Sequence, residues 1–369
     1  MLPAPIAEVL KRVQDHADYM PASQRNQVLV EDLGSEWRSL FSSFDEIPMA
    51  AASIGQVHQA VLASNNQRVA VKIQYPGVAK SISSDLSNLS ILLTASRLLP
   101  KGLYLDKTIA NARTELAWEC DYEREAQCQT RFRDLLAHET EVFTVPKVFL
   151  EACGRQVLTA ELMHGRGVTT SALRLTQTQK DWIGTHIMRL SLMELMDFKF
   201  MQTDPNWTNF LFNADSNKLE LLDFGAAREF PDKFVDPYVS LLIAATKNDR
   251  EIVRERSIEL GYLTGHESQT MLDAHIGSVM TLAEPFALTA SEGEMYAFKD
   301  QTVTDRVREF IPVMIRERLA PPPEETYSLH RKLSGAFLLL ARLGSRVRCR
   351  ELFLDAVKDW KRKRGGVSA

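Results

Sequence analysis

The chain has 369 residues, more than the roughly 250 to 300 that one hydrophobic core usually serves, so we expect two lobes. Its apolar fraction of 45% and charged fraction of 25% are those of an ordinary globular protein, and a net charge of −4 gives no reason to expect a nucleic-acid partner. No apolar run reaches the roughly 18 residues that a membrane-spanning helix needs. The four cysteines form no CxxC pair and no Cys/His cluster, which argues against a structural zinc site.

The first 48 residues are expected to form a helical extension. Apolar residues from Ile6 to Val13 recur at helical spacing, Pro21 breaks this helix, and a second helix is expected to run to about Phe44. The first residues resemble neither a signal peptide nor an Arg-rich presequence. Any targeting information is therefore expected to lie outside this chain.

The remaining elements alternate between strands and helices. We expect strands at 50–62 and 68–73 joined by a hairpin turn at 64–67, long helices at 78–98 and 106–138, strand-like segments at 142–150 and 156–162, and mainly helix from 178, except near 210–223. This order predicts an α+β, two-lobed, protein-kinase-like fold with extra helices. The N-lobe would span 49–163 and the mainly helical C-lobe 164–369.

The most informative stretch runs from residue 199 to residue 230. Asp204 and Asn209 are five residues apart, and Asp223-Phe224-Gly225 follows fourteen residues after Asn209. This is the spacing of a protein-kinase catalytic loop followed by its metal-binding motif. It provides an acid near the nucleophile, an amide oxygen for Mg²⁺ and a carboxylate that bridges Mg²⁺ to phosphates. The sequence therefore predicts a site for ATP and Mg²⁺.

A lysine that holds phosphates and its acidic partner are expected in the first half of the chain. Lys72 closes the apolar strand at 68–73, and a strand lysine that points into a cleft can hold phosphates. The helix at 106–138 carries several acids, of which Asp121 and Glu125 share a face, whereas Glu119 lies well around the helix from Glu125. We expect Glu125 to pair with Lys72.

The loop before that strand departs from a protein-kinase pattern. An alanine-rich run stands where glycines usually fold over the phosphates, and it would be stiffer because each Cβ restricts the backbone. Its residues are Ala50, Ala51, Ala52, Ser53, Ile54, Gly55, Gln56 and Val57. Gln202-Thr203 replaces the usual His-Arg before Asp204, and no Ala-Pro-Glu follows Asp223. Peptide phosphorylation is therefore not expected.

These departures resemble one family. Residues 50–58, 71–78, 119–122, 204–209, 222–226 and 321–332 are similar to the UbiB atypical kinases, in particular the mitochondrial aarF-domain branch of coenzyme Q biosynthesis. The resemblance implies that Glu119 and Asp121 form the family's Glu-x-Asp motif. It also implies that Glu161 to Met163 is the hinge that holds adenine through backbone groups. The family's Lys-x-Gly-Gln motif has no counterpart here, so we expect either that the chain is a fragment or that its start has been assigned too late. Without that segment the active site would be more open.

The resemblance implies an ATPase or small-molecule kinase that uses Mg-ATP to support coenzyme Q biosynthesis. Its location would be the matrix side of the inner mitochondrial membrane, with peripheral membrane association. Lipid quinone precursors and coenzyme Q biosynthesis proteins are the implied partners. A non-catalytic ATP-binding pseudokinase switch or scaffold is the alternative, because nucleotide binding and chemistry use the same residues.

Overall fold

The computed structural model describes residues 19–52, 54–96, 104–204, 206–288 and 291–365. Its helices are α2 (Ala22–Leu33), α3 (Val78–Ser96), α4 (Leu105–Glu119), α5 (Tyr122–Leu135), α6 (Gln177–Met193), α7 (Asp232–Thr246), α8 (Arg250–Glu259), α9 (Gln269–Ala283), α10 (Val303–Glu317), α11 (Glu324–Leu343) and α12 (Cys349–Gly365). Its strands are β1 (Phe41–Phe44), β2 (Ala50–Ala51), β3 (Gly55–Leu62), β4 (Arg68–Gln74), β5 (Phe143–Thr144), β6 (Val157–Glu161), β7 (Arg166–Gly167), β8 (Phe200–Gln202), β9 (Phe210–Asn213), β10 (Lys218–Leu221), β11 (Ala227–Glu229), β12 (Tyr296–Ala297) and β13 (Arg346–Val347).

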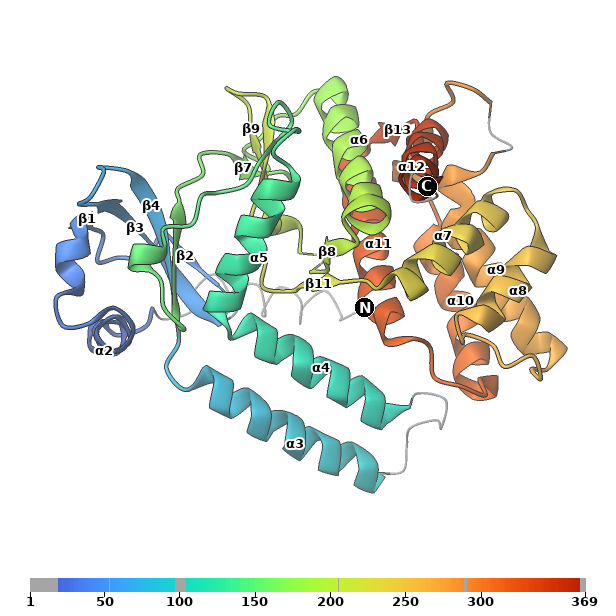
Figure 1. Cartoon of the computed structure of the whole chain (residues 1–369), viewed down its shortest axis with the longest axis horizontal. Coiled ribbons are helices and arrows are strands. Elements are labelled where there is room, and N and C mark those ends of the chain that lie inside the picture. Colours follow the sequence, from blue (N-terminus) through green and yellow to red (C-terminus); the bar gives the residue numbers. More distant parts are fainter. Residues whose placement is uncertain (1–18, 53, 97–103, 205, 289–290, 366–369) are drawn as a thin grey trace.

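The smaller lobe is built on an antiparallel sheet with the order β1-β3-β4-β6. The short strand β2 pairs with Gln56 and Val57, near the start of β3. Alternation along β4 places Val69, Val71 and Ile73 in a core at 0% exposure, and the intervening residues face the other side of the sheet. Helix α2 covers the core side, where Val28 and Leu29 join the same cluster. This lobe lies at the left of Figure 1.

The larger lobe is mainly helical and forms the right half of Figure 1. Helix α6 begins with a capping box between Thr176 and Gln179 and buries Ile183 and Ile187 in the main core. At the edge of this lobe lies a small sheet, β5-β10-β9-β7, and β8 pairs with β11. The segment between β8 and β11 contains the residues expected for a catalytic loop, so these strands hold both of its ends.

Helix α5 connects the two cores. Tyr122 and Ala126, near its start, pack against Leu158 of β6 in the smaller lobe. Phe132, near its end, lies in the larger core, with its ring centroid 5.0 Å from those of Phe200 and Phe224. Helices α3 and α4 pack against one another beneath α5 in Figure 1. The start of α5 therefore lies where residues from both lobes can meet.

Two predicted helices differ from the structure. The second N-terminal helix ends at Leu33 and not near Phe44, because Gly34 follows it with a φ of 89° and Phe41–Phe44 then pairs with β3. Since these residues pack into the core of the smaller lobe, a domain boundary at residue 48 would divide one core. The helix expected at 106–138 is also two helices, separated at Cys120 and Asp121. The first predicted helix lies outside the described residues.

The hairpin of β3 and β4 forms as expected, with Val61 opposite Arg68 across the turn. Helix α10 ends at Glu317, shortly before three successive prolines at 321–323 that cannot continue a helix. Among the described helices, none combines the length and the apolar character needed to cross a membrane.

Candidate active site

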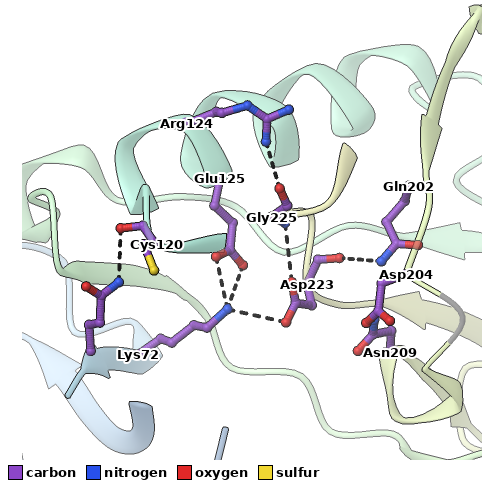
Figure 2. A network of polar contacts seen from close by, with 10 residues as sticks. Lys72, Cys120, Arg124, Glu125, Gln202, Asp204, Asn209, Asp223 and Gly225 are labelled. Atoms are coloured by element: carbon purple, nitrogen blue, oxygen red, sulfur yellow. Dashed lines mark hydrogen bonds and ion pairs between the residues drawn. The ribbon is translucent and has the colours of Figure 1, made fainter. Parts of the chain in front are cut away.

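Lys72 stands at the centre of the site. It lies on the side of β4 opposite the buried valines, so its side chain extends toward α5. Its Nζ donates hydrogen bonds to both carboxylate oxygens of Glu125, at 3.0 and 2.9 Å, and to Oδ2 of Asp223 at 3.3 Å. Figure 2 shows this lysine between the two acids. The predicted Lys72–Glu125 ion pair is thus present, and it is joined by the acid of the Asp-Phe-Gly motif.

The pKa values of Lys72 and Glu125 depend on burial and on the charge of the partner. Burial alone would lower the pKa of Lys72, but the Glu125 and Asp223 carboxylates hold that pKa above its ordinary value, so the ammonium is charged at neutral pH. Burial raises the pKa of Glu125 to about 7, against the opposing effect of Lys72. The ring of Tyr122 lies 4.9 Å from the lysine Nζ, which places an aromatic face beside the cation. The site therefore holds a charged ammonium between two acids at the junction of the lobes.

The break between α4 and α5 gives Glu119 and Asp121 separate roles. Asp121 is the N-cap of α5, and its Oδ1 accepts a hydrogen bond from the backbone N–H of Arg124 at 3.0 Å. Glu119 ends α4, and its backbone Cα lies close to Gly225 of the Asp-Phe-Gly motif. Asp121 and Glu125 both belong to α5, where the Glu125 N–H donates to the Asp121 oxygen at 3.0 Å, whereas Glu119 belongs to α4, so the single helix expected to carry all three acids is wrong.

The catalytic-loop residues form the other side of the site. Asn209 donates from Nδ2 to Oδ2 of Asp204 at 2.7 Å, so its side-chain oxygen is the atom that can serve as a metal ligand. Asp223 has a φ of 57°, in the left-handed region that non-glycine residues rarely adopt. Such strain is typical of functional positions that the surrounding contacts hold in place.

Several contacts hold Asp223 in that conformation. Gln202 donates from Nε2 to the backbone oxygen of Asp223 at 3.0 Å, and Gly225 donates from its backbone N–H to Oδ1 of Asp223 at 3.3 Å. Arg124 donates from Nη1 to the oxygen of Gly225 at 2.7 Å and from Nη2 to the oxygen of Ala227. These bonds are drawn in Figure 2, apart from the one to Ala227.

The acids near Asp223 fit a divalent cation. Burial, together with the Asp223 and Asp204 carboxylates, raises the pKa of Glu119, which shows that negative charge is crowded here. A cation among these groups would relieve that repulsion. The described residues contain no group of three or more His, Cys, Asp or Glu side chains that could hold a metal unaided. Mg²⁺ usually takes one or two protein oxygens and completes its shell with phosphates and water. Asp223 and Asn209 are the residues that could hold it.

The chain is similar to a known protein family over most of its length. Residues 12–257 match the model of the ABC1 atypical kinase-like domain. The chain belongs to this family. The mitochondrial atypical kinase COQ8 of Schizosaccharomyces pombe is 53% identical over 355 residues, which cover 96% of this chain and 57% of that protein. The COQ8 kinase of Saccharomyces cerevisiae is 55% identical over 355 residues, 96% of this chain and 70% of its own length.

Two further comparisons agree. The mitochondrial atypical kinase COQ8B of Danio rerio is 48% identical over 358 residues, 97% of this chain and 56% of its own length. The chain thus spans between 56 and 70% of these three relatives. A solved structure of Rv3197 with erythromycin, from Mycobacterium tuberculosis, matches with a TM-score of 0.70 and 25% identity, over 96% of this chain and 86% of that one. The two-lobed kinase-like fold and the UbiB resemblance expected from the sequence are therefore confirmed.

The alanine-rich loop of this atypical kinase-like domain is the tip of a tight hairpin. Ala50 and Ala51 form β2 opposite Val57 and Gln56, and the Ala52 N–H donates to the oxygen of Gly55 at 2.8 Å. Ser53 lies outside the described residues. The hairpin continues into β4, where Val57 stands opposite Lys72, so the loop and the lysine are neighbours as the sequence predicts.

The expected hinge follows β6. The Glu161 backbone lies opposite Val69 of β4, and its carboxylate Oε2 accepts a hydrogen bond from the N–H of Lys147 at 3.3 Å. The Glu161 N–H donates to the oxygen of Lys147 at 2.8 Å, so the carbonyl is the backbone group of Glu161 that could contact a base. Met163 lies just beyond, on the connection from β6 to β7.

Sequence reasoning gave no role to Gln202, Arg124 and Tyr122, although each contacts the site. The available signal was Gln202-Thr203 in place of His-Arg, since an amide and a hydroxyl can replace the hydrogen bonds that such a pair would make. Gln202 holds Asp223, and Thr203 donates from Oγ1 to the oxygen of Ala226 at 2.8 Å. The two residues before Asp204 thus anchor the segment that contains Asp223.

Proposed function

We propose that the chain is an atypical-kinase-type ATPase or small-molecule kinase that uses Mg-ATP to support coenzyme Q biosynthesis in mitochondria. The observation that carries this proposal is the single cluster formed by Lys72, Glu125 and Asp223, with the bonded pair of Asp204 and Asn209 beside it. The mitochondrial COQ8 relatives support the biological setting. Quinone precursors, coenzyme Q biosynthesis proteins and a peripheral membrane location belong to the same proposal.

In this mechanism the protein positions charges and does little covalent chemistry. Bound Mg²⁺ would supply charge neutralisation at the phosphates, with Asp223 and Asn209 as its protein ligands. Lys72, kept charged by Glu125, would hold the phosphate oxygens. The carboxylate of Asp204 would orient a water or a small hydroxyl in line with the terminal phosphorus and accept its proton. As the new P–O bond forms, the bond to the ADP oxygen breaks, and ADP leaves with the negative charge.

The backbone groups of Glu161 and Met163 would hold the base. The segment from Ala50 to Val57 would cover the phosphates, with Ala52 and Gly55 in the hairpin between β2 and β3. Glu119 and Asp121 would shape the acceptor side, where Glu119 faces the carboxylates of Asp204 and Asp223.

The test is Asp223→Asn, which removes the charge but keeps the size of the side chain. Phosphate release in the presence of Mg-ATP should fall below detection, while the folded state is retained by circular dichroism. Phosphate release equal to wild type would overturn the mechanism. Ala283→Ser, in a buried part of α9 remote from the loop, is a control and should leave the rate unchanged.

A non-catalytic nucleotide switch is the second candidate, and the loop geometry favours it. Ala50 and Ala51 are fixed in strand pairing with β3, which restricts the loop that must close over the phosphates during transfer. A single-turnover assay with radiolabelled ATP separates the candidates. Binding without release of labelled phosphate would support the switch, and release at the rate of complex formation would support the enzyme.

A further inference from the structure

A buried ion pair contacts Gln202, two residues before Asp204 of the catalytic loop. Lys332 of α11 places its Nζ 3.2 Å from Oε2 of Glu194, and the two side chains are 4% and 1% exposed. Glu194 begins a short π-helical turn, Glu194–Phe198, after α6. Such turns are frequent at functional sites. Because taking two charges out of water is costly, a buried pair like this is weak evidence for stability and calls for another explanation.

The pair reaches the metal-binding segment through Gln202. Oε1 of Gln202 lies 3.5 Å from the Nζ of Lys332, and the Gln202 backbone N–H donates to Glu194 Oε1 at 3.3 Å. At the other end of the same side chain, Nε2 donates to the backbone oxygen of Asp223 at 3.0 Å. An ammonium only donates and a carbonyl only accepts, so these two partners fix which end of the amide faces which.

The neighbour of Lys332 binds the next residue of the loop. Arg331 directs its Nε at the backbone oxygen of Thr203, 3.5 Å away, and its guanidinium pairs with Glu115 of α4 at 2.9 and 3.1 Å. Two successive residues of α11 therefore contact the two residues that precede Asp204. Helix α11 thus packs against the start of the catalytic loop.

The end of this chain of contacts is a strained residue. Asp223 has a φ of 57°, which is unfavourable for a residue with a Cβ and persists only when neighbours hold it. We propose that Lys332 and Glu194 are positioning residues that act through Gln202 to hold the Asp223 peptide in this conformation, so that its carboxylate faces Lys72 and the metal site. This inference rests on the proposed function, because it assigns the strain to Mg²⁺ binding.

Two variants test the inference. Gln202→Leu removes the hydrogen bond to Asp223 but keeps the ion pair. The double variant Lys332→Met/Glu194→Gln removes the ion pair and leaves no buried charge unpaired, so it should fold even where Lys332→Met alone does not. ADP binding is measured by calorimetry without metal and across a Mg²⁺ titration. Arg189→Met on α6 is the control, because it removes a half-buried ion pair between Arg189 and Glu139.

Both variants should bind metal-free ADP within about twofold of wild type, since Lys72 is unchanged. The Mg²⁺ concentration needed for half of the metal-dependent gain in affinity should rise about tenfold to a hundredfold, the usual effect of removing an outer-shell partner of a metal ligand. Hydrogen exchange at the backbone N–H groups of residues 224–227 should also become faster in the ligand-free variants. The control should show neither change.

The outcomes separate the inference from the function on which it rests. Variants that match wild type in Mg²⁺ requirement and in exchange would overturn the positioning role alone. A control that changes as much as the variants would also overturn it, because general destabilisation would then explain the result. Wild-type protein whose ADP affinity does not respond to Mg²⁺ would overturn the proposed function and the inference together.

Discussion

The two sides of the site are held in different ways. On the strand side, formed by Lys72, Glu125 and Tyr122, the contacts are between side chains of β4 and α5. On the loop side, formed by residues 202–204, 209 and 223, most contacts end on main-chain atoms. Gln202 and Thr203 donate to the oxygens of Asp223 and Ala226, and the Leu222 N–H donates to the oxygen of Asn209 at 2.9 Å.

This difference teaches what each side can do. Side-chain pairs between two elements can exchange partners when a charged ligand arrives, so the strand side suits recognition of phosphates. Main-chain contacts fix the backbone itself, so the loop side suits a set of ligands whose geometry must not change. Substitutions on the strand side should therefore change affinity and charge balance, and substitutions on the loop side should change geometry.

The largest expected effect is on the strand side. Lys72→Met leaves Glu125 buried at 2% exposure without its partner, and breaking a buried pair in this way typically lowers the free energy of unfolding by about 3–5 kcal/mol. Nucleotide binding should be lost as well. Lys72→Met/Glu125→Gln should recover most of the stability but none of the binding. Urea unfolding and calorimetry with Mg-ADP measure the two effects.

If the single and double variants unfold at the same urea concentration, Glu125 has no unpaired charge to bury and the electrostatic account of this side is wrong. A useful refinement is to repeat the comparison below pH 7. Burial raises the pKa of Glu125 and Lys72 opposes this effect, so in Lys72→Met the carboxyl should take up a proton more readily than in wild type, and lower pH should reduce the difference between the two variants.

The second effect concerns the lobe that supports the loop side. His275 of α9 is 4% exposed, its Nε2 lies 2.9 Å from Ser257 Oγ, and burial lowers its pKa from 6.5 to about 4. Between these two pH values the unfolded chain binds a proton that the folded chain does not. The unfolding free energy should therefore fall as the pH drops through this window, by roughly 3 kcal/mol from this group. Above pH 6.5 the group should have no such effect.

Thermal unfolding from pH 8 to pH 4.5 measures this effect, with His275→Gln as the comparison. The variant keeps a polar partner for Ser257 but cannot titrate, so its stability should fall less steeply with acid. Equal slopes for the two proteins would show that His275 does not sense pH in this range.

The sequence was enough to predict the order of the site residues along the chain and the Lys72–Glu125 ion pair. Lys72, Asp204, Asn209 and Asp223 are separated by fixed spacings, and strand alternation places Lys72 away from the core. What it could not show is the break after Glu119. No glycine or proline marks it, and the turn depends on distant groups: Gln74 donates to the Cys120 oxygen at 3.0 Å, and the Tyr122 N–H donates to the oxygen of Arg155.

The prediction that the second N-terminal helix runs to about Phe44 was wrong for a related reason. Trp37, Leu40, Phe41 and Phe44 follow the apolar spacing of a helix, yet the last four residues of this stretch form a strand. Pairing with β3 and burial of the aromatic rings against one another outweigh the local pattern, with Trp37 and Phe44 centroids 5.2 Å apart. Lys332 was missed because its partners lie more than a hundred residues away in the sequence.

The third effect tests the hairpin next to Lys72. A Cβ added at Gly55 would lie 2.3 Å from the backbone oxygen of Ile73, so Gly55→Ala must push β3 and β4 apart. Overpacking of this kind typically lowers the unfolding free energy by about 1–3 kcal/mol. Gly167→Ala is the matched control, because nothing lies within 4 Å of its added Cβ. Gly55→Ala should unfold at a lower urea concentration than Gly167→Ala. Equal midpoints would show that the hairpin accommodates the extra Cβ without loss of stability.

The smallest effect decides whether the alanine loop belongs to the strand side at all. Ala52→Gly keeps the backbone bond to the Gly55 oxygen but widens the conformations open to the loop. Stability should fall by less than about 1 kcal/mol. The relative affinities for ATP and ADP should change a few-fold, because a freer loop can approach the terminal phosphate that ADP lacks.

Calorimetry with both nucleotides measures this effect, and the control is Ala63→Gly, in the turn between β3 and β4 at the other end of β3. Ala63 is exposed and lies in the turn away from Lys72, so its substitution should not affect either affinity. If Ala52→Gly binds ATP and ADP as wild type does, the stiffness of the loop does not govern the nucleotide. Recognition would then depend on the Lys72–Glu125 pair alone, and the strand side would be confined to β4 and α5.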